Sequence, residues 1–267
     1  MPTLGAALGA LAVRECRALQ HALAIRSKRQ EGIHKARKSC RRLRSVLPLL
    51  PPDPSTDELD QALRQLAHTL APLRDAHIAA RTARVLASAH PARFTPEIVR
   101  VFDDRTHTLL GRALNEDPNW RQRRADVQRM KVALGDLPWQ GIRPGWTKKV
   151  VKKAWRKVKR TREKALAERT PPARHRWRRR ARKLRYLLEF LRKARRMAGM
   201  KKHRTKRYGE QAKQLSTITD QLGWRQDFQI FLDAVEQLPG TVDVQALRRE
   251  LQSKSASWSK SEPRGST

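Results

Sequence analysis

The chain has 267 residues, with 60 lysines and arginines against 25 aspartates and glutamates, so its formal net charge is +35. Its hydrophobic fraction of 39% is sufficient for a buried core, which excludes a chain that is disordered throughout. A charge this large is relieved by a polyanionic partner, so the candidates are nucleic acid, an anionic membrane surface and an inorganic polyanion.

The composition predicts an all-α protein, because Ala, Leu, Arg, Lys and Gln dominate and the alternating apolar pattern of strands is scarce. No stretch approaches the length of a transmembrane helix, so we expect no membrane insertion. The apolar segment 1–12 has no cationic residues before it, and we expect it to be the core face of a first helix rather than a signal peptide. The two cysteines, Cys16 and Cys40, form no disulfide framework, which favours a cytoplasmic location.

Proline-rich and polar breakers divide the chain into helical segments. In the first part we expect helices over about 3–29, 31–50, 57–70, 73–87 and 96–114, with Ser55 or Thr56 as the N-cap of the third. A connecting segment, 115–146, contains a short helix over 121–134. The last part holds a basic helix from residue 147, a second cationic helix after Pro172, and helices near 203–222, 225–237 and 242–252. Residues 253–267 are predicted to be a disordered tail.

Two cationic runs repeat the same pattern 141 residues apart. The first, at 34–44, reads H-x-x-R-K-x-x-R-R-L-R, and the second, at 175–185, reads H-x-x-R-R-x-x-R-K-L-R. On a helix, each run places an apolar stripe opposite a cationic face. The two stripes consist of Ala36, Cys40, Leu43, Leu47 and Leu50, and of Trp177, Ala181, Leu184, Leu188 and Leu191. The two cationic faces consist of His34, Arg37, Lys38, Arg41, Arg42 and Arg44, and of His175, Arg178, Arg179, Arg182, Lys183 and Arg185.

Like charges one turn apart destabilise a helix, so this crowding points to a bound anion rather than to helix stability. The duplication also extends beyond the cationic runs: the segments 70–78 and 222–230 share Leu, Asp and Ile at matching positions, with a shift of 152 residues. We therefore predict one domain over 1–252, a helical bundle of two pseudo-symmetric halves, about 1–114 and 147–252. The connecting segment 115–146 joins them, and the two cationic helices line a basic groove.

These motifs resemble those of the CHAD family, named for its histidine and α-helical domain. The resemblance rests on both cationic runs, the second continued by Y-x-x-E-F to residue 190, and on the segments 70–78 and 222–230. It covers nearly the whole chain except the tail. The resemblance implies two pseudo-symmetric helical halves around a basic channel that binds inorganic polyphosphate, in proteins associated with polyphosphate granules. It also implies that the cations of the two runs are the ligands.

The residues argue against catalysis and against a cofactor. The sequence contains no phosphate-binding glycine loop and no nucleophile elbow, and neither His34 nor His175 has a second metal ligand at suitable spacing. It also lacks the E-x-E-x-K strand of the triphosphatase domain to which CHAD domains are sometimes fused. We therefore expect a non-enzymatic protein without a cofactor or metal. Each of the two histidines is either a capping or core-edge residue or a phosphate donor.

Other interpretations remain open. A nucleic-acid (RNA or DNA) binding protein has the same electrostatic character, although aromatic residues are only 5% of this chain. An enzyme that makes or cuts polyphosphate would need a carboxylate pair such as Asp75 and Asp227, which we instead expect to pair with arginines of the cationic helices. A further basic surface is either an auxiliary polyanion contact or a solubilising surface; it consists of Lys149, Lys152, Lys153, Arg156 and Arg160.

Overall fold

The computed structural model describes residues 1–89 and 96–238, and over these residues it contains helices and no β-strand. The predicted all-α class is therefore confirmed. The helices are α1 (Leu4–Ala24), α2 (Arg29–Val46), α3 (Pro54–Thr69), α4 (Ala71–Ala89), α5 (Pro96–Glu116), α6 (Arg121–Asp136), α7 (Pro144–Glu168), α8 (Pro171–Met197) and α9 (Lys202–Val235). Short 3-10 turns occur at η1 (Leu47–Leu49), η2 (Pro118–Trp120) and η3 (Trp139–Gly141). The predicted helix at 242–252 and the predicted tail at 253–267 lie outside the described residues.

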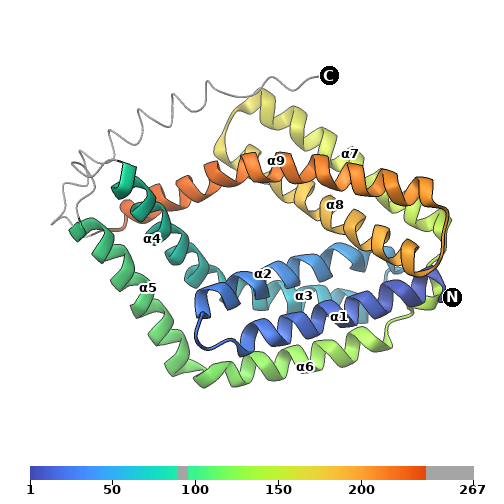
Figure 1. Cartoon of the computed structure of the whole chain (residues 1–267), viewed down its shortest axis with the longest axis horizontal. Coiled ribbons are helices and arrows are strands. Elements are labelled where there is room, and N and C mark those ends of the chain that lie inside the picture. Colours follow the sequence, from blue (N-terminus) through green and yellow to red (C-terminus); the bar gives the residue numbers. More distant parts are fainter. Residues whose placement is uncertain (90–95, 239–267) are drawn as a thin grey trace. The chain divides into compact units, whose positions relative to one another are not determined.

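Contacts divide the chain into two compact units. The larger unit consists of Met1–Arg74 and Gly111–Trp224, and the smaller unit combines 75–110 with the segment that begins at Arg225. Each unit draws on both of the predicted sequence halves. Within the larger unit, α1 packs on α2, α6 and α8, and α2 also packs on α3 and α8. Figure 1 shows α1, α2, α3 and α6 side by side in this unit, and α7 packs along α8.

The core of the larger unit contains the apolar stripes that the sequence predicts. On α2, Ala36, Cys40 and Leu43 have no exposed surface, and on α8 the residues Ala181 and Leu188 are equally buried. The predicted apolar face of the first helix is also buried, at Leu4, Ala7, Leu8, Leu11 and Ala12. Burial of this apolar surface, rather than helix propensity, holds two strongly cationic helices in place.

The two cysteines of the larger unit are free, buried thiols. Burial raises the pKa of Cys16 to about 11 and that of Cys40 to about 12. Because the thiolate is the reactive form, both residues behave as small apolar core residues in the folded protein.

Several helix boundaries differ from the sequence prediction. The N-cap of α3 is Asp53, whose side chain accepts a hydrogen bond from the Ser55 amide at 2.9 Å, so the predicted cap at Ser55 or Thr56 is wrong. Pro54 occupies the first helical position, where a missing amide hydrogen is harmless. The first helix ends at Ala24 rather than near residue 29, because Ile25 is extended.

Helix α9 is continuous from Lys202 to Val235, where the sequence predicts two helices separated at Gly223. A single glycine inside a helix costs about 1 kcal/mol relative to alanine, which long helices tolerate. Gly223 is buried, and a side chain there would place its Cβ 3.0 Å from an Arg178 nitrogen. The glycine therefore gives room to a cationic side chain of α8.

The smaller unit has an aromatic core of its own. Phe102 of α5 and Phe231 of α9 lie with their ring centroids 5.2 Å apart, and Phe228 packs against Phe231 at 6.3 Å. Alanines of α4 complete this core, among them Ala79, Ala80 and Ala83. In the part of the chain that the structure describes, no helix combines the length and apolar character needed to cross a membrane.

Candidate anion-binding site

The two cationic helices, α2 and α8, pack against each other in the larger unit. Arg41 of α2 and Arg178 of α8 lie close enough to Arg182 for their charges to lower its pKa. Arg74, in the first turn of α4, also acts on Arg182. Arginines of α2, α8 and the first turn of α4, all within the larger unit, thus gather around one guanidinium.

Arg182 has the least compensated charge in this cluster. Burial is the main cause that lowers its pKa, to about 9, with further contributions from Arg41, Arg178 and Arg74, while Tyr186 opposes the shift. Arg182 makes no hydrogen bond or ion pair to any other residue of the described ranges. A buried cation among like charges is unfavourable until an anion joins it. The arrangement is therefore suited to binding a multivalent anion.

Two arginines of the motif are oriented by backbone carbonyls. Arg37 Nη1 donates a hydrogen bond to the Ala67 carbonyl of α3, and Arg178 Nε donates to the Thr219 carbonyl of α9 at 3.2 Å. The donors are 141 residues apart and the acceptors 152 residues apart, which are the two shifts of the sequence duplication. In each repeat, the first motif arginine thus donates to a carbonyl three residues before the Leu–Asp segment, at Ala67 of α3 and at Thr219 of α9.

Other motif arginines bind carboxylates within the protein. Arg42 donates to Glu15 of α1 at 2.9 Å and to Glu189 of α8 at 3.0 Å, and its side chain is only 14% exposed. It also lies over the rings of Tyr186 and Phe190, at 5.6 and 5.5 Å. Arg42 therefore connects three helices, as a structural cation would.

Arg44 and Arg185 are held in a similar way. Arg44 makes a bidentate pair with Asp60 of α3, with both hydrogen bonds at 2.9 Å. Arg185 donates to Ser216 at 2.8 Å and to Thr219 at 3.1 Å, and it lies 4.8 Å from the centroid of the Tyr186 ring. Helical periodicity groups these two arginines with the ligand candidates. It cannot detect their partners, because those partners come from other helices.

The remaining motif residues differ in exposure. His34, Lys38 and Arg179 are exposed, whereas Arg37 and His175 are half-buried. Neither histidine caps its helix: Lys28 and Thr170 hold the N-cap positions of α2 and α8, so the capping interpretation is wrong. No group of three or more metal-ligating side chains occurs within 1–89 and 96–238.

A family model of the CHAD domain matches residues 8–236. The chain belongs to the CHAD domain family. It is similar to the crystal structure of the CHAD domain from the plant Ricinus communis, with a TM-score of 0.67 and 20% sequence identity, over 95% of this chain and 87% of that chain. That likeness shows a shared fold. No curated protein matches the chain at a significant level.

The further basic surface of this CHAD domain lies on α7 and is separate from Arg182. Lys149, Lys152, Lys153 and Arg156 line a groove of about 780 Å³ in the larger unit, and Arg160 does not. Lys183 also lines this groove, so the second run presents Lys183 towards α7 and Arg182 towards Arg41. Sequence reasoning missed Arg74, Lys157 and Arg180, although Arg74 lies within the 70–78 segment and Arg180 within the second run.

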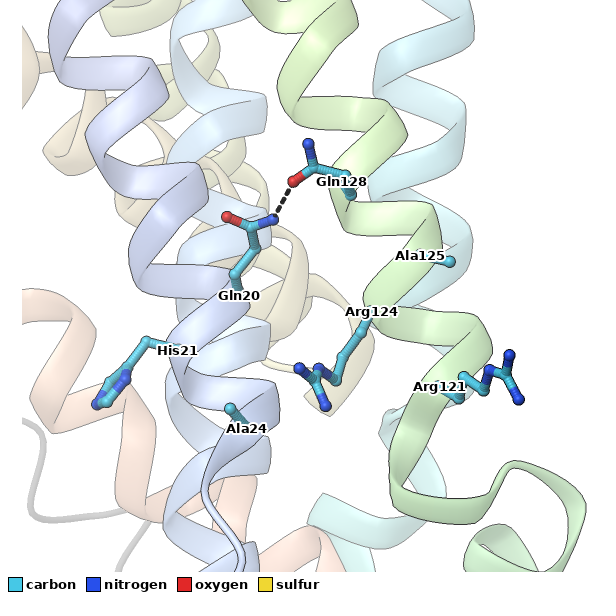
Figure 2. Close-up of a pocket in the computed structure, with 7 residues that line it drawn as sticks. All are labelled: Gln20, His21, Ala24, Arg121, Arg124, Ala125 and Gln128. Atoms are coloured by element: carbon cyan, nitrogen blue, oxygen red, sulfur yellow. Dashed lines mark hydrogen bonds between the residues drawn. The ribbon is translucent and has the colours of Figure 1, made fainter.

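A smaller pocket of the CHAD domain, of about 600 Å³, lies between α1 and α6. Gln20 and Gln128 close one end of it through a hydrogen bond of 2.7 Å. Figure 2 shows His21 and Arg121 directed outward on opposite sides, with Arg124 between the two helices. These side chains do not converge on one point, so this pocket is a poorer anion site than the Arg182 cluster.

Proposed function

We propose that this CHAD domain binds inorganic polyphosphate without transforming it. The observation that carries the proposal is Arg182, a half-buried guanidinium that has no partner in the described residues and lies among Arg41, Arg74 and Arg178. A phosphate chain supplies regularly spaced negative charge, and a guanidinium can bridge two of its oxygens. The net charge of +35 attracts such a chain from a distance.

We assign the motif residues two roles according to their contacts. Arg41, Arg178 and Arg182 bind phosphate oxygens directly, and exposed Lys38 and Arg179 extend the contact from their helices. Arg42, Arg44 and Arg185 are positioning residues, since protein carboxylates and hydroxyls already engage them. His34 and His175 add hydrogen-bond donors that strengthen when protonated. As the place of this binding, we propose the cytoplasm, on the surface of polyphosphate granules.

The direct test is polyphosphate affinity of the triple variant R41A/R178A/R182A, with circular dichroism to verify its helices. Each lost charge-assisted contact weakens binding by about tenfold, so the triple variant should lose nearly all affinity at near-physiological salt. The matched control is K159Q, which removes an exposed cation of α7 outside the cluster. Unchanged affinity of a folded triple variant contradicts the proposal.

Nucleic acid is the competing ligand, and the same protein can decide between the two. Long-chain polyphosphate and single-stranded RNA should be competed at equal salt, because both respond to net charge. We expect polyphosphate to displace RNA at far lower phosphate concentration. Preferential RNA binding, or release of orthophosphate on incubation with Mg²⁺, would instead support a nucleic-acid reader or an enzyme.

A further inference from the structure

The α7 groove has a chemical character that polyphosphate does not require. It lies in the larger unit, between α7 and α8 on one side and η1 and the start of α3 on the other. Its basic lining, here the basic wall, comes from α7 and α8 and consists of Lys149, Lys152, Lys153, Arg156, Lys157, Arg180 and Lys183. Its apolar lining, here the apolar wall, comes from η1 and the prolines after it, from Leu184 and Leu187 of α8 and from Trp146 at the start of α7. Its volume of about 780 Å³ is within the range of small-molecule sites.

The apolar wall offers flat, rigid surfaces. The leucines that line it, among them Leu47, Leu50 and Leu184, are at most 3% exposed and present little surface to a ligand. The exposed apolar groups are Pro48, Pro51, Pro52 and Trp146. An acyl chain favours mobile aliphatic surface, whereas prolines and an indole match a planar ring.

Trp146 is fixed and accessible at the same time. Its indole Nε1 donates a hydrogen bond to the Leu49 carbonyl at 2.9 Å, yet the residue is 43% exposed. An exposed tryptophan held in one orientation is preorganised for stacking. Lys153 lies two turns further along α7, about 10 Å along the helix axis. An aromatic surface and a row of ammonium groups therefore share one helix and one groove.

The basic wall is crowded by like charges. Burial and the charges of Arg180, Lys153 and Arg160 lower the pKa of Lys157. Burial also lowers the pKa of Lys183, together with Arg44, Arg180 and Lys157, while Asp60 opposes the shift. Two carboxylates also line the groove: Asp60 is paired with Arg44, and Asp57 is exposed at the start of α3. The cations outnumber them, so the basic wall favours a ligand with several negative charges.

We propose that this groove binds a nucleoside triphosphate, with its base stacked on Trp146 and the neighbouring prolines and its phosphates on Lys153, Lys157, Arg180 and Lys183. Asp57 is placed to accept a hydrogen bond from a ribose hydroxyl or a base amino group. This site is distinct from the Arg182 cluster and extends the function beyond polyphosphate. A bare phosphate chain has no ring, so it would leave the apolar wall unused.

The test compares ATP and GTP with inorganic tripolyphosphate, which carries similar charge without a base. Because tripolyphosphate can also bind at the Arg182 cluster, the comparison is made in full-length R41A/R178A/R182A. Calorimetric titration at about 0.15 M salt should give an affinity for the nucleotides about tenfold higher than for tripolyphosphate, the contribution expected of one stacked base. Equal affinities for nucleotide and tripolyphosphate would overturn the proposal.

Three variants test whether the preference for nucleotide over tripolyphosphate arises in the groove. W146L should abolish it, whereas W146F retains a planar ring and should keep most of it, which also covers the case in which W146L fails to fold. K153Q/K157Q should weaken nucleotide and tripolyphosphate alike, by about tenfold or more. The control K159Q changes an exposed cation of the same helix that does not line the groove and should have no effect. A nucleotide preference that survives in folded W146L contradicts the assignment.

The nucleotide test can fail or succeed independently of the polyphosphate site at Arg182. R41A/R178A/R182A should keep the nucleotide preference over tripolyphosphate while losing long-chain polyphosphate. Loss of the preference in that variant would place the base near Arg182 and overturn the groove assignment. Loss of polyphosphate binding in K153Q/K157Q, with the triple variant unaffected, would instead place polyphosphate in the groove and overturn the Arg182 cluster as its site.

Discussion

Arg182 on α8 and Arg42 on α2 belong to the same duplicated pattern but have opposite surroundings. Arg42 bridges Glu15 and Glu189, whereas Arg182 lies among Arg41, Arg74 and Arg178 with no partner in the described residues. The first arrangement compensates a cation that is largely withdrawn from water. The second leaves a cation uncompensated, so that binding of an anion relieves its unfavourable surroundings. Charge alone therefore does not reveal the role of a residue here.

This contrast predicts stability changes of opposite sign. R182M removes an uncompensated cation but keeps the side-chain volume, and we expect it to stabilise the protein by about 1 kcal/mol. R42M removes the shared cation of two carboxylates, leaving Glu15 with Ser39 and Glu189 with Arg185, and we expect a loss of about 2–3 kcal/mol. Thermal unfolding in buffer without phosphate or sulfate measures both, at about 2–4 °C per kcal/mol for a chain of this size.

The variants R182M and R42M should also change stability and polyphosphate affinity independently of each other. R182M should bind polyphosphate more weakly despite its higher melting temperature, while folded R42M should retain most of the affinity. Destabilisation by R182M in the absence of anions would show that Arg182 is a structural residue and would contradict its assignment as a ligand.

At the scale of helices, Gly223 of α9 illustrates how one element positions a residue of another. The glycine lies against the guanidinium of Arg178, which donates to the Thr219 carbonyl one turn earlier on α9. G223A should displace the Arg178 side chain by a few tenths of an ångström or more, because the added Cβ would approach it at 3.0 Å. We expect lower polyphosphate affinity with intact helicity.

G135A is the matched control for this prediction. Gly135 lies in α6, and an added Cβ there meets nothing within 4 Å. The substitution should raise stability by up to about 1 kcal/mol through helix propensity and leave affinity unchanged. Equal affinities of G223A, G135A and the parent protein would show that Arg178 does not depend on Gly223.

The helices themselves were largely predictable, because burial follows the periodicity of apolar residues along one segment. Ala36, Cys40 and Leu43 lie on the predicted stripe and are fully buried. The break predicted at Gly223 was wrong, because α9 continues through this residue. The glycine lies against Arg178 of α8, and a contact with another helix does not appear in the local sequence pattern. The roles of Arg42 and Arg44 escaped prediction for the same reason: Glu15 and Asp60 are supplied by other helices.

For the whole molecule, the net charge of +35 opposes folding by self-repulsion, and any bound or screening anion relieves it. Sodium chloride should therefore raise the melting temperature, because at 0.1 M it screens the repulsion between exposed charges more than about 10 Å apart. Polyphosphate should raise it more at equal ionic strength, because it binds the folded state specifically. Equal shifts from the two salts would indicate screening without a site.

The salt dependence of polyphosphate binding measures how many charges the whole site neutralises. If about ten phosphates are contacted, the logarithm of affinity should fall with the logarithm of salt concentration with a slope of about −7, by the single-strand coefficient. R182M should make this slope shallower by about 0.7, since it removes one phosphate contact. R42M should leave the slope unchanged, because Glu15 and Glu189 already balance that cation. Equal slopes for R182M and the parent protein would place Arg182 outside the phosphate path, even if its affinity were reduced.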